Sequence, residues 1–444
     1  DELNLSDVQT ELLIGSLGFW SLFGSLFSYW VCDKFGRRRS FDVAAVSVII
    51  GLLIMSSSHA YIQLMIGRLF VGLGVGFGLA IDPLYIAEIA PAEHRGWLSC
   101  WSEFAINIGI LLGFISGIVF YPVADHLSWR FMLLVGCILP SVMLVLTRTV
   151  MPESPRWLVG KDREDEAKQV LQRIYGEDND GVVETVTQEI RETLELEKKA
   201  DEIGWKAIFC PSPAVFRMLL CGLGTAVAQP ATGIEVILYY ALDILENAGL
   251  TNELARLGVL IVLGLVKTSF IVLGGYLLDK IGRRKSFFIS YAGMCAALVM
   301  IGFDFVFGGS SPAVPIIALA IFMSFFSIAS GPGAWLVPSE VFSNTIRARA
   351  MSLTSFSNRL VGSIMSSTFL STVALIGWGG FFLTMAGACV AVILYLFWLL
   401  PETNGRSIED MTVFFANLTG DTKILEAEAL LVQTRTDKKN DEVV

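Results

Sequence analysis

The sequence is short of charged residues, which make up only 17% of its 444 positions, whereas 54% are hydrophobic. A soluble domain of this size would carry more charge and a less apolar composition. The mean hydropathy of +0.63 therefore predicts a protein that crosses a membrane several times. The net charge of −10 says little about partners, because the acidic residues crowd into two polar segments.

The sequence also lacks the residue patterns of several functional classes. It has three histidines, and its seven cysteines are scattered with no CxxC pair, so we expect no metal site and reduced cysteines that pack. It contains no GxxxxGK[ST] loop, no nucleophile–base pair and no block of basic residues with interleaved aromatics. We therefore expect no ATP use, no enzyme activity, no cofactor and no nucleic-acid partner.

Long apolar runs dominate what is present. Each is about 20 residues long or slightly longer, which is the length that a helix needs to cross a bilayer. The predicted fold class is an all-α membrane protein with eleven visible spans, at roughly 11–31, 41–58, 62–87, 98–120, 129–150, 214–241, 257–278, 286–307, 314–336, 351–375 and 379–400.

Basic residues occur in alternate short loops. The loops at 33–40 and 279–286 hold Lys and Arg and the loop at 343–349 holds Arg, whereas opposite loops such as 56–61 and 307–313 hold none. The positive-inside rule predicts that these basic loops and the C-terminus are cytoplasmic and that the chain begins outside. Because the chain begins outside without a signal peptide, we expect that a first helix is missing from the sequence.

The chain divides into four predicted segments. Residues 1–150 form an N-terminal helical bundle (spans 2–6), and residues 214–411 form a C-terminal bundle (spans 7–12). Between them, 151–213 is charged with apolar residues at helical spacing, which predicts a cytoplasmic linker with short amphipathic helices. The polar residues 412–444 are expected to form a cytoplasmic tail that ends in disorder.

Three motifs of the first half return in the second half. "DKFGRRRS" returns as "DKIGRRKS", "AEIAPAEHRG" as "SEVFSNTIRAR", and "PESPRW" as "PETNGRS", each at an offset of roughly 250 residues. The two halves are therefore predicted to be duplicates with parallel topology. The first half shows five spans and the second six, so the missing helix would be the first of a six-plus-six set.

The repeated arginines and carboxylates are candidates for a cytoplasmic gate that closes in one state and separates in another. The alternative is that the basic loops only anchor the chain on the cytoplasmic side. The candidate gate residues are Asp33, Arg37, Arg38, Glu88, Arg95, Glu153, Arg156, Asp279, Arg283, Arg284, Glu340, Arg347 and Glu402.

These repeats, together with "GRLFVGLGVG", "QPATGIEVILYY" and "GPGAW", resemble the sugar porter branch of the major facilitator superfamily over nearly the whole chain. The resemblance implies twelve helices in two six-helix bundles with alternating access to a central site. Within the branch, "VKTSFIVL", "SEFAINIGILLGF" and "SNR" look most like plant-type polyol and monosaccharide proton symporters.

The resemblance also implies the substrate contacts. One contact of the family is in doubt, because Pro230 stands where the family usually has a second glutamine. At three positions this chain has a charged residue where the family usually has an amide, as in polyol carriers. Glu103 stands in place of glutamine, and Glu235 and Lys267 stand in place of asparagine. The candidate substrate-binding residues are Glu103, Gln229, Glu235, Lys267, Trp335 and Asn358.

Lys267 stands in the middle of an apolar run, where an ammonium group is costly unless it faces a wet cavity or finds a partner. Glu103 and Glu235 are its candidate partners, and such a network suits the hydroxyls of a sugar or polyol. The alternative is a structural salt bridge that only joins helices. The coupling candidates are Arg68, Asp82 and Glu103. By the resemblance Arg68 works with an aspartate on the first span, and Asp82 is either titratable or placed at a wet kink beside Pro83.

The sequence thus predicts a secondary transporter that moves a polyol or monosaccharide by alternating access, expected to act as a proton symporter in the plasma membrane. Its expected partners are the small-molecule substrate, the proton and the lipid bilayer. The alternatives are a facilitated-diffusion carrier and a sugar receptor that does not transport. Only about 30 residues follow Met411, which is short for a signalling tail.

Overall fold

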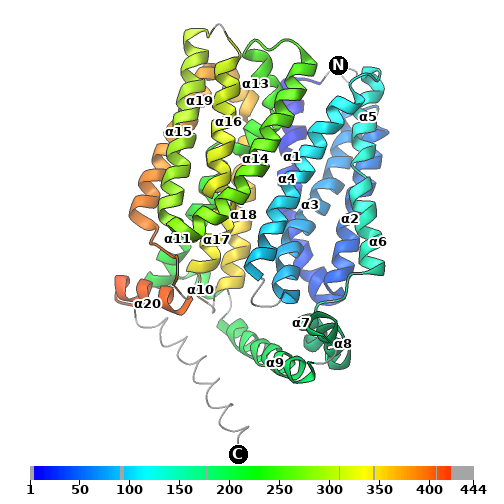
Figure 1. Cartoon of the computed structure of the whole chain (residues 1–444), viewed down its shortest axis with the longest axis vertical. Helices are drawn as coiled ribbons and strands as arrows, with labels where there is room; N and C mark the ends of the chain where they lie inside the picture. Colours follow the sequence, from blue (N-terminus) through cyan, green and yellow to red (C-terminus); the bar gives the residue numbers. More distant parts are fainter. Residues whose placement is uncertain are drawn as a thin grey trace, which may run out of the picture.

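The computed structural model describes residues 5–90, 95–176, 179–203, 205–309, 311–343, 346–406 and 408–421. Within these ranges the chain forms helices joined by short turns, with no strand. Two bundles of long helices stand side by side, with a layer of shorter helices across one end (Figure 1). Because Arg37 and Arg283 lie at that end, we call it the basic end.

The first bundle comes from the first half of the chain. Its long helices coincide with the apolar runs, and α1 and α2 are separated by Gly36, whose φ of 91° favours glycine. α5 and α6 share one span, interrupted at Gly136 and Cys137. The helices are α1 (Asp7–Phe35), α2 (Arg37–Ser56), α3 (Tyr61–Ile89), α4 (Arg95–Phe120), α5 (Asp125–Val135) and α6 (Ile138–Thr149).

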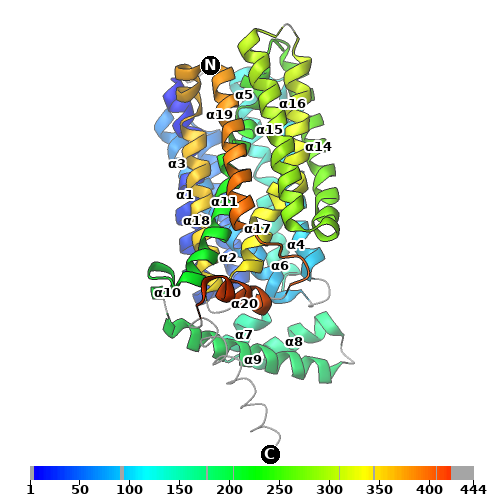
Figure 2. The ribbon, with the colours of Figure 1, turned by 90° about the vertical axis from the view of Figure 1, so that its left-hand side faces the viewer.

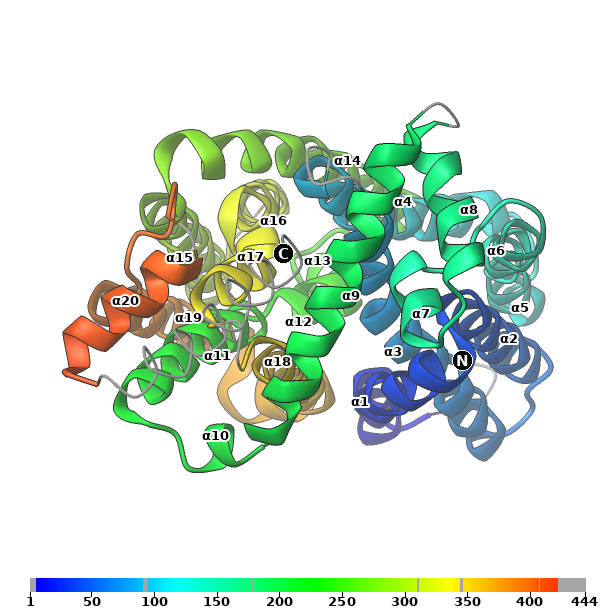
Figure 3. The ribbon, with the colours of Figure 1, turned by 90° about the horizontal axis from the view of Figure 1, so that it is seen from below.

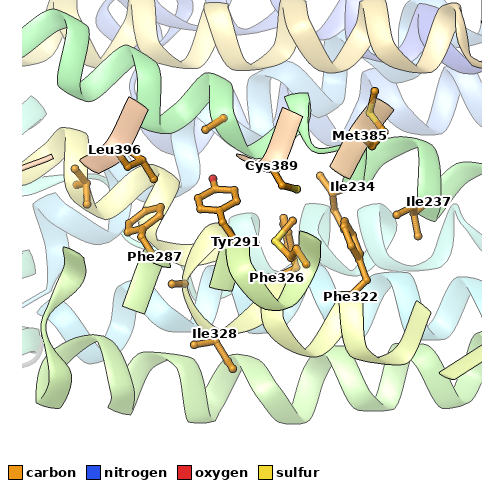
Figure 4. Packing of buried hydrophobic residues seen from close by; sticks show 14 of the residues in the cluster. Ile234, Ile237, Phe287, Tyr291, Phe322, Phe326, Ile328, Met385, Cys389 and Leu396 are labelled. Carbon is orange, nitrogen blue, oxygen red and sulfur yellow. The ribbon is translucent and has the colours of Figure 1, made fainter. Parts of the chain in front are cut away.

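The second bundle is built around a larger aromatic core. Phe287, Tyr291, Phe322 and Phe326 are buried together in it (Figure 4). Its helices are α11 (Pro213–Ala231), α12 (Ile234–Tyr239), α13 (Ala241–Asn247), α14 (Glu253–Ile281), α15 (Arg283–Phe307), α16 (Ala313–Phe325), the π-helix η1 (Phe326–Ser330), α17 (Gly331–Val341), α18 (Arg347–Ser367) and α19 (Phe369–Leu399).

Ten helical segments in the described part of the chain are long and apolar enough to span a membrane. The eleventh predicted span, at 351–375, corresponds mainly to α18, which is too polar to meet that measure. α18 packs against both α1 and α11, so it lies between the bundles (Figures 2 and 3). Thr354, Asn358, Ser363 and Ser366 of α18 are buried and therefore face protein rather than lipid.

The linker forms four helices that lie beneath the bundles (Figure 2). They are α7 (Pro155–Gly160), α8 (Glu164–Tyr175), α9 (Asp180–Ile203) and α10 (Lys206–Phe209). α7, α8 and α9 pack through apolar side chains on one face, as their amphipathic pattern predicts. α9 is longer than the short helices expected, because its 24 residues contain no proline to end it.

The predicted segment boundaries at 150 and 214 fall at the end of α6 and near the start of α11. The boundary predicted after residue 411 does not match, because α20 (Ile408–Thr419) continues through it. Met411 and Phe415 of α20 are buried against the second bundle, so this part of the tail is a packed element. The rest of the predicted tail, from 422 onward, lies outside the described residues.

Candidate functional site

The candidate site lies where the two bundles meet. The most extensive packing between the bundles is that of α1 on α18 and of α4 on α14, and α1 also contacts α19. Gly264 of α14 lies against Leu111 and Phe114 of α4, and Ile14 and Phe114 of the first bundle pack on the core of the second. These contacts come from the halves of α1 and α4 away from the basic end.

Glu103 and Lys267 face each other across the α4–α14 contact. Lys267 is only 7% exposed, and its Nζ lies 5.7 Å from the ring centre of Phe326. Glu103 is the carboxylate whose charge acts on Lys267, yet among the described residues no ion pair joins Lys267 to any acid. The two groups therefore lie near each other without a direct bond.

Glu235 has a different partner from the one expected. Its carboxylate Oε1 lies 3.7 Å from Nη1 of Arg359 on α18, and the same carboxylate packs directly on Gly362. Gly233, with φ of 84°, breaks the helix between α11 and α12 and thereby places Glu235 at the start of α12. Arg359 lies in the motif "SNR" but was not among the predicted site residues.

Gln229 and Asn358 form a hydrogen-bonded relay among three helices. The Asn358 Nδ2 group donates to Oε1 of Gln229 at 2.9 Å and to the carbonyl of Ala226 at 2.7 Å. The Gln229 Nε2 group donates to the carbonyl of Gly331 at 3.2 Å. In this state both amides thus join α11, α17 and α18 to one another. A bound substrate would have to exchange with these hydrogen bonds.

Trp335 lies half-buried on α17, which begins with the "GPGAW" motif. The ring of Phe287 approaches Gly333 so closely that a Cβ there would lie 2.6 Å from it. Within the described part of the chain Trp335 makes no ring–ring contact and belongs to no core cluster.

Arg68 and Asp82, the other coupling candidates, are not brought together. Both lie on α3, and their separation of fourteen positions corresponds to about 21 Å along a helix. The Arg68 Nε atom is buried and finds no acceptor among the described residues. Its charge acts instead on Tyr239 of α12, so Arg68 faces the second bundle.

The candidate gate residues of the first half form a cluster at the basic end. Arg37 binds Glu88 through both ends of its guanidinium group, with Nε–Oε2 at 2.8 Å and Nη2–Oε1 at 2.6 Å. Glu153 accepts the backbone N–H groups of Arg37 and Arg38. Asp33 lies 3.7 Å from Lys161, which directly follows α7.

The second half repeats this cluster with small differences. Arg283 binds Glu340 and, at 3.2 Å, Asp279. Glu402 accepts the backbone N–H groups of Arg283 and Arg284. Each cluster thus joins neighbouring helices of its own half.

Three other candidate gate residues are placed by their helices. Arg156 lies on α7 and Arg347 begins α18, whereas the side chain of Arg95 lies outside the described residues. Whether any of the thirteen acts as a gate remains a prediction.

In the part of the chain that the structure describes, the candidate site coincides with neither a group of metal-ligating side chains nor one of two apolar grooves. Among the described residues no group of three or more His, Cys, Asp or Glu side chains could hold a metal ion. Two apolar grooves of about 450 and 710 Å³ are lined by residues of α6 and by residues around α11 and α19. Neither groove includes any of the candidate substrate-binding residues.

Known proteins resemble this chain along almost its whole length. The model of the family "Sugar (and other) transporter" matches residues 1–415. The "Probable polyol transporter 4" of Arabidopsis thaliana is 36% identical over 437 residues, which is 97% of this chain and 83% of that protein. The "Major myo-inositol transporter IolT" of Bacillus subtilis is 33% identical over 419 residues, or 93% of this chain and 86% of that protein.

Among solved structures, the chain is similar to the xylose transporter XylE from E. coli. A partially occluded inward-open conformation of XylE aligns with a TM-score of 0.78 at 25% identity, covering 91% of each chain. A second structure, described as a proton:xylose symporter bound to 6-bromo-6-deoxy-D-glucose, aligns with a TM-score of 0.77 at 26% identity. That alignment covers 93% of this chain and 91% of XylE.

Proposed function

The chain belongs to the sugar transporter family, and from this membership we propose that it moves a polyol or monosaccharide across a membrane by alternating access. It is an integral membrane transporter of the major facilitator fold and not an enzyme. The relatives described as polyol and myo-inositol transporters support a small polyhydroxylated substrate.

One observation supports the site above the others. Lys267 of the second bundle and Glu103 of the first face each other without an ion pair between them. An ammonium group donates hydrogen bonds and a carboxylate accepts them, so a solute with several hydroxyls can bridge the two groups. A substrate bound in this way contacts both bundles, as alternating access requires.

The other substrate-binding residues surround this pair from the second bundle. Glu235 supplies a second carboxylate, Trp335 supplies an apolar face for the carbon skeleton, and the Gln229–Asn358 relay supplies amides. Gln229 and Glu235 lie on either side of the break between α11 and α12, Trp335 follows the π-helix η1 on α17, and Asn358 lies in the middle of α18.

The orientation follows from charge. The basic end faces the cytoplasm, with the linker helices and the C-terminus on that side, and the plasma membrane is the proposed location. The inter-bundle contacts lie away from the basic end, so the site opens toward the cytoplasm in this state. An inward-open structure of XylE aligns with the chain, which supports this assignment.

The proposed driving force is a proton gradient, as the symporter description of XylE supports. Glu103 is the favoured coupling group because it is a carboxylate at the interface between the bundles. Arg68 and Asp82 stay further candidates. Facilitated diffusion is the alternative, in which Glu103 only binds the substrate.

The test is uptake with electrical recording. The protein is expressed in oocytes, and current is measured while glucose, sorbitol or myo-inositol is added at acidic and at neutral external pH. An inward current that grows on acidification supports symport, whereas labelled substrate entering without current supports facilitated diffusion. Binding without entry would replace transport by a receptor function.

A matched pair of variants tests the site itself. Lys267→Met should abolish uptake while leaving the protein in the membrane. Lys280→Met, on the same helix but exposed and hydrogen-bonded to Tyr276, should retain uptake. Equal uptake by the two variants would contradict the role proposed for Lys267.

A further inference from the structure

Glu11 is a buried carboxylate for which neither the sequence motifs nor the proposed site accounts. It lies on α1 of the first bundle and is 1% exposed. Its Oε1 accepts the backbone N–H of Ser371 at 2.7 Å, and its Oε2 accepts the Ser371 hydroxyl at 2.5 Å. Ser371 lies in the first turn of α19, so these two hydrogen bonds cross between the bundles.

No cation offsets the charge of Glu11 among the described residues. A buried carboxylate is costly unless it is hydrogen-bonded, and the first N–H groups of a helix have no partner within that helix. Glu11 and the start of α19 therefore satisfy each other only while the bundles touch. The neighbouring titratable group is Tyr240, whose hydroxyl donates to the Ser366 carbonyl rather than to Glu11.

The helices around this contact approach too closely for side chains. A Cβ built on Gly15 would lie 1.7 Å from the Ser367 hydroxyl, and one on Gly18 would lie 3.1 Å from Cβ of Ser363. The Ser363 hydroxyl also donates to the carbonyl of Gly15 at 2.9 Å. α1 and α18 thus lie side by side (Figure 2) at the end of the molecule opposite the basic end.

We propose that Glu11 and Ser371 form a latch between the bundles that holds this end of the transporter closed and opens once in every transport cycle. The role rests on the proposed function, because only alternating access requires the end to open. Glu11 is a positioning residue: it contacts no substrate and acts through the distance between α1 and α19.

The latch predicts opposite effects on affinity and turnover. Hydrogen bonds to a charged group are among the stronger ones in proteins, so Glu11→Ala should raise the ratio of open to closed molecules at this end about tenfold or more. The fraction ready to bind external substrate rises with it, which lowers the external half-saturation concentration. Maximal uptake should fall, because the closed state is reached less often.

The experiment measures the opening directly. Spin labels are placed at positions 62 and 307, which are 71% and 79% exposed on different bundles at this end, in a background where the seven native cysteines are replaced. Distances are recorded by pulsed electron resonance in proteoliposomes. The wild type should show mainly the shorter distance, and Glu11→Ala should shift the population to a longer one.

Two further variants make the result specific. Ser371→Ala removes the hydroxyl but keeps the backbone N–H, so it should shift the distances in the same direction by less, and it decides the matter if Glu11→Ala fails to fold. Glu253→Ala removes an exposed carboxylate from the first turn of α14 at the same end and should change nothing.

Unchanged distances in folded Glu11→Ala and Ser371→Ala would overturn the latch, even if uptake is normal in the wild type. Conversely, shifted distances in a protein that takes up no substrate would retain the latch and reject the transport function.

Discussion

Replacing Arg37 by methionine should destabilise the protein more than the same change at Arg283, although the two residues occupy equivalent positions of the repeat. Arg37 grips both oxygens of Glu88, whose side chain is 3% exposed. Arg283 directs Nε and Nη2 to a single oxygen of Glu340, at 3.2 and 3.0 Å. Glu340 is 22% exposed, and its other oxygen accepts the Thr403 hydroxyl at 2.6 Å.

The magnitudes follow from what each variant leaves behind. Arg37→Met strands a buried carboxylate without a cation, which costs about 3–5 kcal/mol. Arg283→Met leaves Glu340 with a hydrogen-bond donor and access to water, which corresponds to about 1–3 kcal/mol. Replacing Glu88 by glutamine together with Arg37→Met should recover much of the loss, because no charge then stays buried.

The assay is unfolding of the purified protein in detergent, followed by tryptophan fluorescence. Lys161→Met serves as the control, because its ion pair with Asp33 is long and exposed and contributes little. Arg37→Lys separates structure from membrane anchoring: lysine keeps the positive charge but cannot form the two-oxygen contact with Glu88. Equal losses in Arg37→Met and Arg283→Met, or full stability in Arg37→Lys, would refute the reasoning.

Two further predictions concern the candidate site. Gly362→Ala should reduce uptake with little loss of stability, because the added Cβ would lie 2.1 Å from Oε2 of Glu235 and displace the carboxylate. The control is Gly387→Ala, where the added Cβ meets open space. Equal uptake by the two variants would contradict this role for Glu235. Asn358→Leu should lower the free energy of unfolding by about 1–3 kcal/mol and also impair uptake. It leaves Gln229 Oε1 and the Ala226 carbonyl without a hydrogen-bond donor. An unchanged unfolding curve would show that the relay is dispensable.

Helices and their repeat could be predicted from the sequence because they depend on local properties. A run of apolar residues forms a helix in lipid whatever its neighbours are, and the predicted spans match the long helices closely. α18 is also a helix, but it is polar because it packs between the bundles. Its hydropathy alone does not reveal that position. The break between α5 and α6 was not predicted, although Pro140 of α6 signals it, because proline cannot donate a hydrogen bond to the carbonyl four residues earlier, at Gly136.

Partners across the interface could not be predicted with the same success. The sequence placed three charged residues at mid-membrane and suggested that Lys267 pairs with both acids. In the structure Glu103 lies near Lys267, but Glu235 forms an ion pair with Arg359 instead. Which acid meets which base depends on the rotation and vertical register of the helices, within the second bundle for Glu235 and between the bundles for Glu103, and neither quantity is encoded in hydropathy.

Glu11 was missed for a related reason. It lies near the start of the first apolar run, where an acidic residue is ordinarily read as part of a wet helix end. Its burial results from the approach of α19, which begins 358 positions later at Phe369. Only the assembled structure shows that its two oxygens meet donors of the other bundle.

The distribution of strong and weak contacts supports movement of the bundles as rigid bodies. Within each bundle, guanidinium–carboxylate pairs such as Arg37–Glu88 tie helix ends together, and breaking a buried pair costs several kcal/mol. Between the bundles, the contacts described are glycine–serine packing, a few hydrogen bonds and the apolar contact of α4 with α14. Water can replace the hydrogen bonds as the surfaces separate. Separating the bundles therefore costs less free energy than distorting either bundle. A substrate that bridges Glu103 and Lys267 has to favour one closed arrangement over the other by only a few kcal/mol to redirect that movement.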